Sequence, residues 1–294
     1  MNAPKKSWVQ TLFTQNPMMA EVTRFRKRFL SFRGSSVAVN GGIGIVLVCY
    51  ALFAIICVYY RGDIPPILLI GGFMVLMFFA IPLMLHASIA GERERRSWDM
   101  LLVAPITHGQ IIVGKFMGAF AGLAMAFGLF LIPVLIDATF MTKVQLDDIL
   151  LASIVVFAQG ASLIAMTILI SARVRRPLIA LGVTIAIVLL YFFFLPAFSN
   201  AFNSFTGSFI NSLLSPIDVM SRIGMEHAYD YGSSGERFSA ASMDRMTLVI
   251  GHLIFQLIVT ATMLAWATKT LIFADNEVKF IPKSKTNARS KKPA

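Results

Sequence analysis

The chain has 294 residues, of which 57% are hydrophobic and only 14% are charged. Several of its apolar runs reach the roughly 20 helical residues that cross a hydrocarbon layer about 30 Å thick, which excludes an ordinary soluble domain. The net charge of +11 would suggest a nucleic-acid partner for a soluble protein, but in a membrane protein it has to be counted loop by loop.

Residues 1–36 are polar and basic, and we expect an amphipathic helix within them. Asn16 is a good N-cap and Pro17 suits the first helical position. Apolar residues then recur at steps of three and four: Met18, Val22, Phe25, Phe29 and Phe32. Basic residues occupy the other side, so this helix would lie in the headgroup layer and face anionic lipid. An ordinary cytosolic helix packed on the bundle is the alternative.

Six apolar segments follow, and we predict that each crosses the membrane as a helix. Their expected limits are residues 37–60, 64–89, 111–136, 149–170, 178–196 and 246–273. The predicted fold is therefore an all-α membrane protein with a six-span domain over residues 37–273. A basic cytoplasmic tail, residues 274–294, follows it.

The third segment carries glycines at four-residue spacing. Gly114, Gly118 and Gly122 form a stripe of small residues along one face of the predicted helix, and such a stripe lets a second helix approach closely. We therefore predict a helix-packing face there.

An even number of spans places both termini on one side, and the basic residues indicate which side. Only five of the 26 Lys and Arg residues fall on the side opposite the termini: Arg61, Lys143, Arg222, Arg237 and Arg245. The others lie at the two ends of the chain and in the loops after the second and fourth spans. Both termini and these loops are thus expected to be cytoplasmic, in the plasma (inner) membrane. The net charge then reflects topology, and no nucleic-acid partner is expected.

The external segment before the sixth span, residues 197–245, is too long for a turn. Its first half, residues 198–214, is rich in Phe, Ser and Asn, which suits a re-entrant or interfacial segment. Its second half, residues 226–245, is polar, and we expect an exposed loop there.

No motif of an energy-converting or hydrolytic enzyme is present. The sequence contains no phosphate-binding G-x-x-x-x-G-K-S/T loop, no H-E-x-x-H, no nucleophile elbow and no Cys/His cluster at metal-ligand spacing. Ion-coupled carriers usually need a titratable group at depth, whereas the aspartates here lie at span ends or in loops. We therefore expect no catalytic residue, bound cofactor or metal, and no proton- or sodium-driven carrier.

The loop between the second and third spans combines a charge cluster with an apolar face. Charged residues run from Glu92 to Arg96, and Pro105 ends the segment. Between them, Trp98, Leu101 and Leu102 could insert into a groove of a partner while the charges fix the register. The alternative is a plain surface ion pair between Glu92 and Arg96, worth a few tenths of a kcal/mol.

The run E-R-E-R-R-S-W-D-M-L-L-V-A-P over residues 92–105, followed by Gly114-Lys115, resembles the cytoplasmic signature of type-2 ABC transporter permeases. That signature commonly reads E-R-E-x-G-T-x-E-x-L-L-x-x-P, followed by G-K. Here Arg96-Ser97 replaces the usual Gly-Thr, and Asp99 replaces the usual Glu. The resemblance implies a coupling element that contacts the nucleotide-binding subunit. The residues that it assigns to coupling are Glu92, Arg93, Glu94, Arg95, Trp98, Asp99, Leu101, Leu102 and Pro105.

The resemblance also implies the partners. The chain would be the permease subunit of an ABC transporter, with export as the expected direction and without an ATPase motif of its own. It would work with a cytosolic ABC ATPase that binds ATP and Mg²⁺, with a second permease copy or a related permease, and in contact with membrane lipid. A six-span scaffold that recruits cytosolic partners without transport is the alternative, and a membrane-embedded lipid transferase is a third class. The sequence does not identify a substrate.

Overall fold

The computed structural model describes residues 48, 50–57, 59, 65–94, 106–140, 146–201, 213–229 and 245–279. The helix expected after Asn16, most of the first predicted span, loop residues 95–105 and the tail beyond residue 279 lie outside the described residues. Within them, all regular secondary structure is helical.

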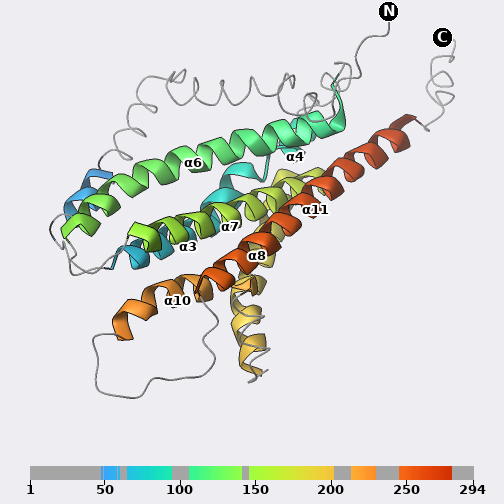
Figure 1. The fold of residues 1–294 in the computed structure, drawn as a ribbon. Coiled ribbons are helices and arrows are strands. Elements are labelled where there is room, and N and C mark those ends of the chain that lie inside the picture. Colours follow the sequence, from blue (N-terminus) through green and yellow to red (C-terminus); the bar gives the residue numbers. More distant parts are fainter. Residues whose placement is uncertain are drawn as a thin grey trace, which may run out of the picture.

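Figure 1 shows the helices as elongated rods, several of which run alongside α7. Their bounds are α3 (Pro66–Leu85), α4 (Ala90–Glu94), α6 (His108–Phe140), α7 (Leu146–Arg173), α8 (Pro177–Ala201), α10 (Pro216–Tyr229) and α11 (Arg245–Lys279). Four stretches are long and apolar enough to cross a membrane: Pro66–Glu94, His108–Thr139, Leu146–Arg173 and Met246–Ile272. The chain is therefore a multi-pass membrane protein, and the count of six spans stays a prediction.

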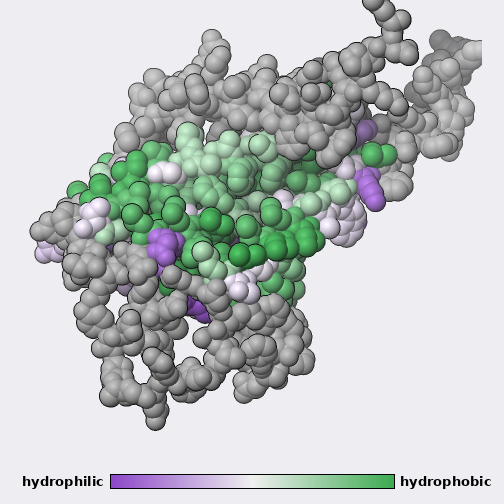
Figure 2. Space-filling view, viewed as in Figure 1, coloured by the Kyte–Doolittle hydropathy of each residue, from purple (hydrophilic) through white to green (hydrophobic). Residues whose placement is uncertain are grey.

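The surface of the described part is largely apolar on the face seen in Figure 2, with hydrophilic residues confined to a few places near its margins. Exposed apolar side chains lie on several helices, and they include Leu76, Leu129, Leu190, Ile254 and Ile258. Lipid tails solvate such side chains as well as a protein core does. This surface fits a bilayer rather than water.

The helices extend beyond the predicted spans. For example, α6 covers residues 108–140 where we predicted 111–136, and α11 covers 245–279 where we predicted 246–273. Polar residues at a helix end do not stop it, although they end the apolar run from which the span was predicted. The helix of the second span is instead shorter than the predicted range, residues 64–89. Helix α3 ends at Leu85, and the chain turns through residues 86–89 before α4.

Helix α7 is the centre of the bundle. In its most apolar 18-residue window 78% of the residues are buried, against 17% to 33% in the other three candidate spans. It packs against α3, α6, α8, α10 and α11. Three of its buried hydroxyls bond to carbonyls of the same helix: Ser153 to Ile149 at 2.6 Å, Ser162 to Gln159 at 2.9 Å and Thr167 to Leu163 at 2.8 Å. The helix thus satisfies these polar side chains itself.

Aromatic side chains pack α6 against α3 and α7. The ring centroid of Phe73 on α3 lies 5.1 Å from that of Phe127 and 4.7 Å from that of Phe130, both on α6. Phe157 on α7 meets Phe127 edge to face at 5.3 Å. Within the predicted first span, Phe53 stacks on Phe130 at 5.1 Å. These contacts give the bundle a specific register.

Helix α10 lies within the segment that we expected to be external. It buries Val219, Met220 and Ile223 against α3, α7 and α11, because these apolar residues recur at helical spacing. It continues to Tyr229, so the first residues of the expected exposed loop, which begins at Glu226, are helical instead. Residues 202–212, the larger part of the expected re-entrant segment, lie outside the described residues.

The tightest glycine contact in the described part is at Gly160 on α7. A Cβ atom added there would overlap Leu123 Cδ2 on α6 and would lie 3.1 Å from Met77 Sδ on α3. A Cβ added at Gly118 would meet no atom within 4 Å. The stripe of Gly114, Gly118 and Gly122 remains a prediction, and the close approach of helices occurs at a glycine that the spacing did not single out.

We predict that Gly160→Ala destabilises the protein whereas Gly118→Ala does not. Both changes gain the same helix propensity, about 0.5–1 kcal/mol, so their difference reports on packing. Displacing Leu123 in a filled core costs about 1–3 kcal/mol. Thermal unfolding of the purified protein in detergent should therefore show a lower midpoint for Gly160→Ala. The double variant with Leu123→Ala should lose less than the two single losses summed, and equal midpoints for both glycine variants would contradict the contact.

Candidate functional site

Of the loop residues predicted to couple to an ATPase, the structure describes Glu92, Arg93 and Glu94, which lie in α4. The other residues assigned to coupling, Arg95, Trp98, Asp99, Leu101, Leu102 and Pro105, belong to residues 95–105 and lie outside the described residues. Three attachments and a helix cap show how the membrane helices hold the two ends of this loop.

The first attachment is a single hydroxyl on the central helix. Ser171 Oγ accepts hydrogen bonds from the main-chain N–H groups of Ile89 at 3.0 Å and Ala90 at 3.1 Å. The same hydroxyl donates to the carbonyl of His86 at 2.8 Å. Ser171, Ile89 and Ala90 are fully buried, so water cannot replace these bonds. This explains why α3 ends where it does: the groups exposed by the turn find their partner on α7.

Arg93 makes the second attachment. Its Nη1 donates to the carbonyl of Ala172 at 2.6 Å, one of the last four carbonyls of α7, which have no partner within their own helix. A cation at this end is also favoured by the helix dipole. The second residue of the charge cluster therefore caps the central helix.

The third attachment joins α4 to α6. Glu92 Oε1 and Lys115 Nζ lie 2.7 Å apart, and the side chains of Lys115 and Glu92 are only 8% and 27% exposed. Removing one member of a buried pair leaves the other charge without compensation and is strongly destabilising. The Lys of the Gly-Lys pair thus has a partner within the chain, and this partner is the first residue of the charge cluster.

The far end of the loop is closed by a capping box at the start of α6. The N–H of Thr107 donates to Gln110 Oε1 at 2.9 Å, and the N–H of Gln110 donates to Thr107 Oγ1 at 3.3 Å. The T-x-x-Q spacing over residues 107–110 is a recognised sequence signal for such a cap. Both flanks of residues 95–105 are therefore fixed.

Helix α7 is in turn joined to α11 at two levels. The guanidinium carbon of Arg173 lies 4.2 Å from the ring centroid of Trp266, which is a cation–π contact. Further along, Gln256 Nε2 donates to Gln159 Oε1 at 2.8 Å, and both residues are buried. Direct side-chain contacts thus connect the loop to α7, and α7 to α11.

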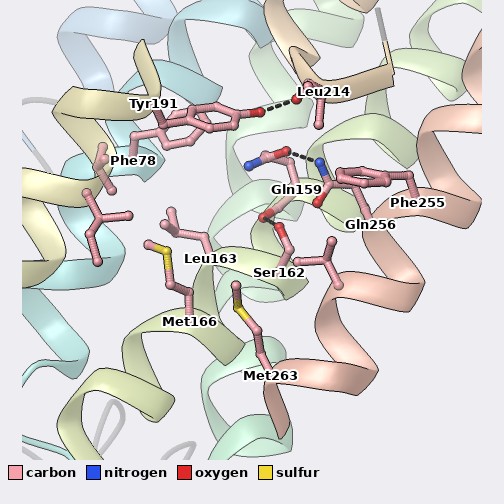
Figure 3. Close-up of a pocket in the computed structure, with 13 residues that line it drawn as sticks. Phe78, Gln159, Ser162, Leu163, Met166, Tyr191, Leu214, Phe255, Gln256 and Met263 are labelled. Atoms are coloured by element: carbon pink, nitrogen blue, oxygen red, sulfur yellow. Dashed lines mark hydrogen bonds between the residues drawn. The ribbon is translucent and has the colours of Figure 1, made fainter. Parts of the chain in front are cut away.

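A cavity of about 250 Å³ lies between α3, α7, α8 and α11 (Figure 3). Its lining residues are Phe78, Gln159, Ser162, Leu163, Met166, Ile187, Val188, Tyr191, Leu214, Phe255, Gln256, Val259 and Met263. At one end the Tyr191 hydroxyl donates to the carbonyl of Leu214, and His252 Nδ1 lies 2.9 Å from the carbonyl of Leu213. From the sequence, polar residues within the spans such as Gln159 and Ser162 could either line a pathway or bond helix to helix; both line this cavity, and Gln159 also bonds to α11. The cavity itself was not predicted.

The described residues offer no metal centre, because no group of three or more His, Cys, Asp or Glu side chains comes together among them. What the arrangement offers is mechanical: a charged loop fixed at both flanks to a bundle, and a mostly apolar cavity inside that bundle.

Comparison with known families agrees with this arrangement. No curated protein matches the chain. The family model described as ABC-2 family transporter protein matches residues 59–269, a range that includes the charged loop and the cavity. Because the match covers well over half of the 294 residues, the chain belongs to the ABC-2 transporter family and is a membrane permease subunit of an ABC transporter.

Proposed function

We propose that the protein is the permease of an ATP-driven exporter in the plasma (inner) membrane, with both termini cytoplasmic. It acts with a second permease, identical or related, and with two copies of a separate cytosolic ABC ATPase, which binds the ATP and Mg²⁺. The observation that carries the proposal is the attachment of the loop between α4 and α6 to the most buried helix of the bundle.

Coupling requires that a movement imposed on the loop reaches the spans. Ser171 and Arg93 fix α4 to the end of α7, and Glu92 with Lys115 fixes it to α6. A loop held only by its two chain ends could move without displacing a helix. One held by short, buried hydrogen bonds to another helix transmits its displacement as a rigid-body shift.

From α7 the displacement passes to α11 through the Arg173 contact with Trp266 and the bond between Gln159 and Gln256. These two helices have the most extensive contact in the described bundle. ATP-driven closure of the ATPase pair would thus rock α7 and α11 together against the second permease.

The scaffold alternative needs a loop that binds a partner, but it does not need that loop to be fixed to α7. One measurement distinguishes a transporter from a scaffold. A transporter co-purifies with an ATPase whose hydrolysis responds to changes at α4, whereas a scaffold leaves hydrolysis by any bound ATPase unchanged.

We predict that Ser171→Ala uncouples the complex. The change leaves the N–H groups of Ile89 and Ala90 without their acceptor, at about 1–3 kcal/mol for each buried group. ATP hydrolysis by the purified complex in lipid vesicles should fall several-fold while the ATPase stays bound.

Ser153→Ala is the matched control for Ser171→Ala, because it is the same change on the same helix and the Ser153 hydroxyl bonds only to its own helix at Ile149. It should keep normal hydrolysis. Equal activities for the two variants would show that α4 does not transmit through Ser171.

We predict that Glu92→Lys reduces hydrolysis and that adding Lys115→Glu restores much of it. The single variant places two cations together at a largely buried site, whereas the double variant rebuilds the pair with reversed sign. Hydrolysis by the reconstituted complex, compared with Glu94→Lys as the neighbouring control, measures this. No rescue in the double variant would mean that Glu92 acts on the ATPase directly and not through α6.

We predict that Leu101→Asp leaves the protein inserted in the membrane but lowers its affinity for the ATPase, since a charge would replace an apolar contact residue. The amount of ATPase that co-purifies with the membrane-extracted permease should fall roughly ten-fold, which corresponds to about 1.4 kcal/mol. Full retention of the ATPase with full hydrolysis would remove Leu101 from the interface.

A further inference from the structure

The cavity between α3, α7, α8 and α11 lies at depth in the bundle. On α11, Gln256 and Met263 are 11 and 18 residues beyond Arg245, or about 16 and 27 Å along the helix at 1.5 Å per residue. On α7, Gln159 is 13 residues beyond Leu146, or about 20 Å along. These depths place the cavity within the hydrocarbon layer of the membrane. A ligand of the cavity is therefore either a membrane component or the molecule that the protein transports.

The lining has two parts. Figure 3 shows Leu163, Met166 and Met263 around one part of the space, and the side chains of Gln159 and Gln256 bonded to each other at another. None of the thirteen described lining residues carries a charge at neutral pH. A charged ligand would lose its hydration here without a counter-charge, so the lining selects an uncharged molecule.

The two glutamines keep unused hydrogen-bonding capacity. Their one bond uses an N–H of Gln256 and the oxygen of Gln159, whereas each amide has two donors and an acceptor oxygen. Among the described residues, the Gln159 amide nitrogen and the Gln256 oxygen make no further bond. Neither atom is fully enclosed by the protein. In Figure 3 the Gln159 nitrogen points into the space beside Tyr191 and Phe78.

Each glutamine thus offers one free polar atom to the mostly apolar cavity, a donor on Gln159 and an acceptor on Gln256. A hydroxyl, which both donates and accepts, can bond to Gln159 Nε2 or to Gln256 Oε1. An amide that lacks partners in a low-dielectric site is costly, so a bound hydroxyl would be favoured over a bare methylene group there.

The size of the cavity indicates how much of the ligand it holds. Pockets for whole small molecules usually measure about 300–1,000 Å³, and this one, at about 250 Å³, is smaller. Only one end of a long molecule fits, and the remainder has to extend outside.

The side between α8 and α11 offers that exit. Both helices pack on α7, but in the described part they do not pack extensively on each other. The lining residue Ile187 on α8 is 39% exposed. Leu190, one turn further along α8, is 62% exposed, and Ile258 on α11, next in sequence to the lining residue Val259, is 57% exposed. In a bilayer these apolar flanks contact lipid tails, so an alkyl chain can pass from the membrane into the cavity.

We propose that this cavity binds the hydroxyl-bearing end of a neutral long-chain alkyl molecule, which enters from the membrane between α8 and α11. Gln159 or Gln256 holds the hydroxyl, and Leu163, Met166, Val259 and Met263 surround the first carbons of the chain. The site belongs to a single subunit and does not depend on the direction of transport or on the coupling role of the loop.

The test uses the full chain reconstituted in phosphatidylcholine vesicles and a photoreactive 1-hexadecanol with its diazirine close to the hydroxyl. Mass spectrometry should find the label on the stretches around residues 159–166 and 255–263. Unlabelled 1-hexadecanol should compete roughly ten-fold better than hexadecane, the ratio expected from about 1.4 kcal/mol. Labelling confined to the lipid-facing side chains, or equal competition by both compounds, would overturn the proposal.

Two variants and a control separate the cavity from the surface. Val259→Phe fills the cavity and should abolish labelling, whereas Ile258→Phe, its exposed neighbour on the same helix, should not change it. The double variant Gln159→Leu with Gln256→Leu replaces both amides by apolar groups, which is often tolerated.

The double variant should bind hexadecane and hexadecanol equally. It keeps the test decisive if Val259→Phe does not fold. A preference for the alcohol that survives in the double variant would show that the glutamines do not hold the hydroxyl.

Discussion

The structure depends on one constraint: main-chain polar groups within a bundle that lacks water must find partners on the protein. Where α3 ends at Leu85, main-chain groups lose their partners within the helix. Ser171 Oγ on α7 forms hydrogen bonds with three such groups, two N–H groups and one carbonyl, at 2.8 to 3.1 Å. Because the bonds join residues more than 80 positions apart in sequence, the end of one span and the start of the charged loop become part of the surface of another span. The loop cannot shift without straining that junction or carrying α7 with it.

Because α7 lies at the centre of the bundle, a displacement at this junction affects many helices. A helix on the rim of the bundle could be displaced without disturbing much else, whereas α7 contacts five other long helices. Hydroxyls such as those of Ser153 and Thr167 bond within the helix, so few polar contacts join α7 to particular neighbours. The described ones lie at Ser171, at the Ala172 carbonyl that Arg93 caps, at Gln159 and at the Arg173 contact with Trp266. The helix is held firmly at its loop end and by one amide pair in its middle.

Sequence reasoning predicted the long apolar helices α3, α6, α7, α8 and α11 and the family, because both depend on local patterns. Long apolar runs identify spans irrespective of what they contact, and the charged loop is contiguous. It missed what depends on a distant partner. Nothing local to residues 86–89 predicts the break after α3, since its cause is Ser171.

Packing shows the same limit. Regular spacing drew attention to Gly118, but the need for a glycine is set by the neighbours of Gly160, which are Leu123 and Met77. Helix α10 was missed for a related reason. Its apolar residues are few, and their role in packing is evident only from their contacts with α3, α7 and α11. The cavity needs four helices to exist, so no single segment could predict it.

The loop and the cavity act on the same helix. Gln159 and Ser171 are 12 residues apart on α7, or about 18 Å along its axis, and Gln159 is the residue that bonds α7 to α11 beside the cavity. A ligand that prefers one arrangement of α7 and α11 therefore biases the position of the loop, and a partner that holds the loop biases the cavity by the same free energy, since coupling between two sites is reciprocal. The amide pair is the point at which the two meet, because any sliding of α7 along α11 has to stretch or exchange that bond.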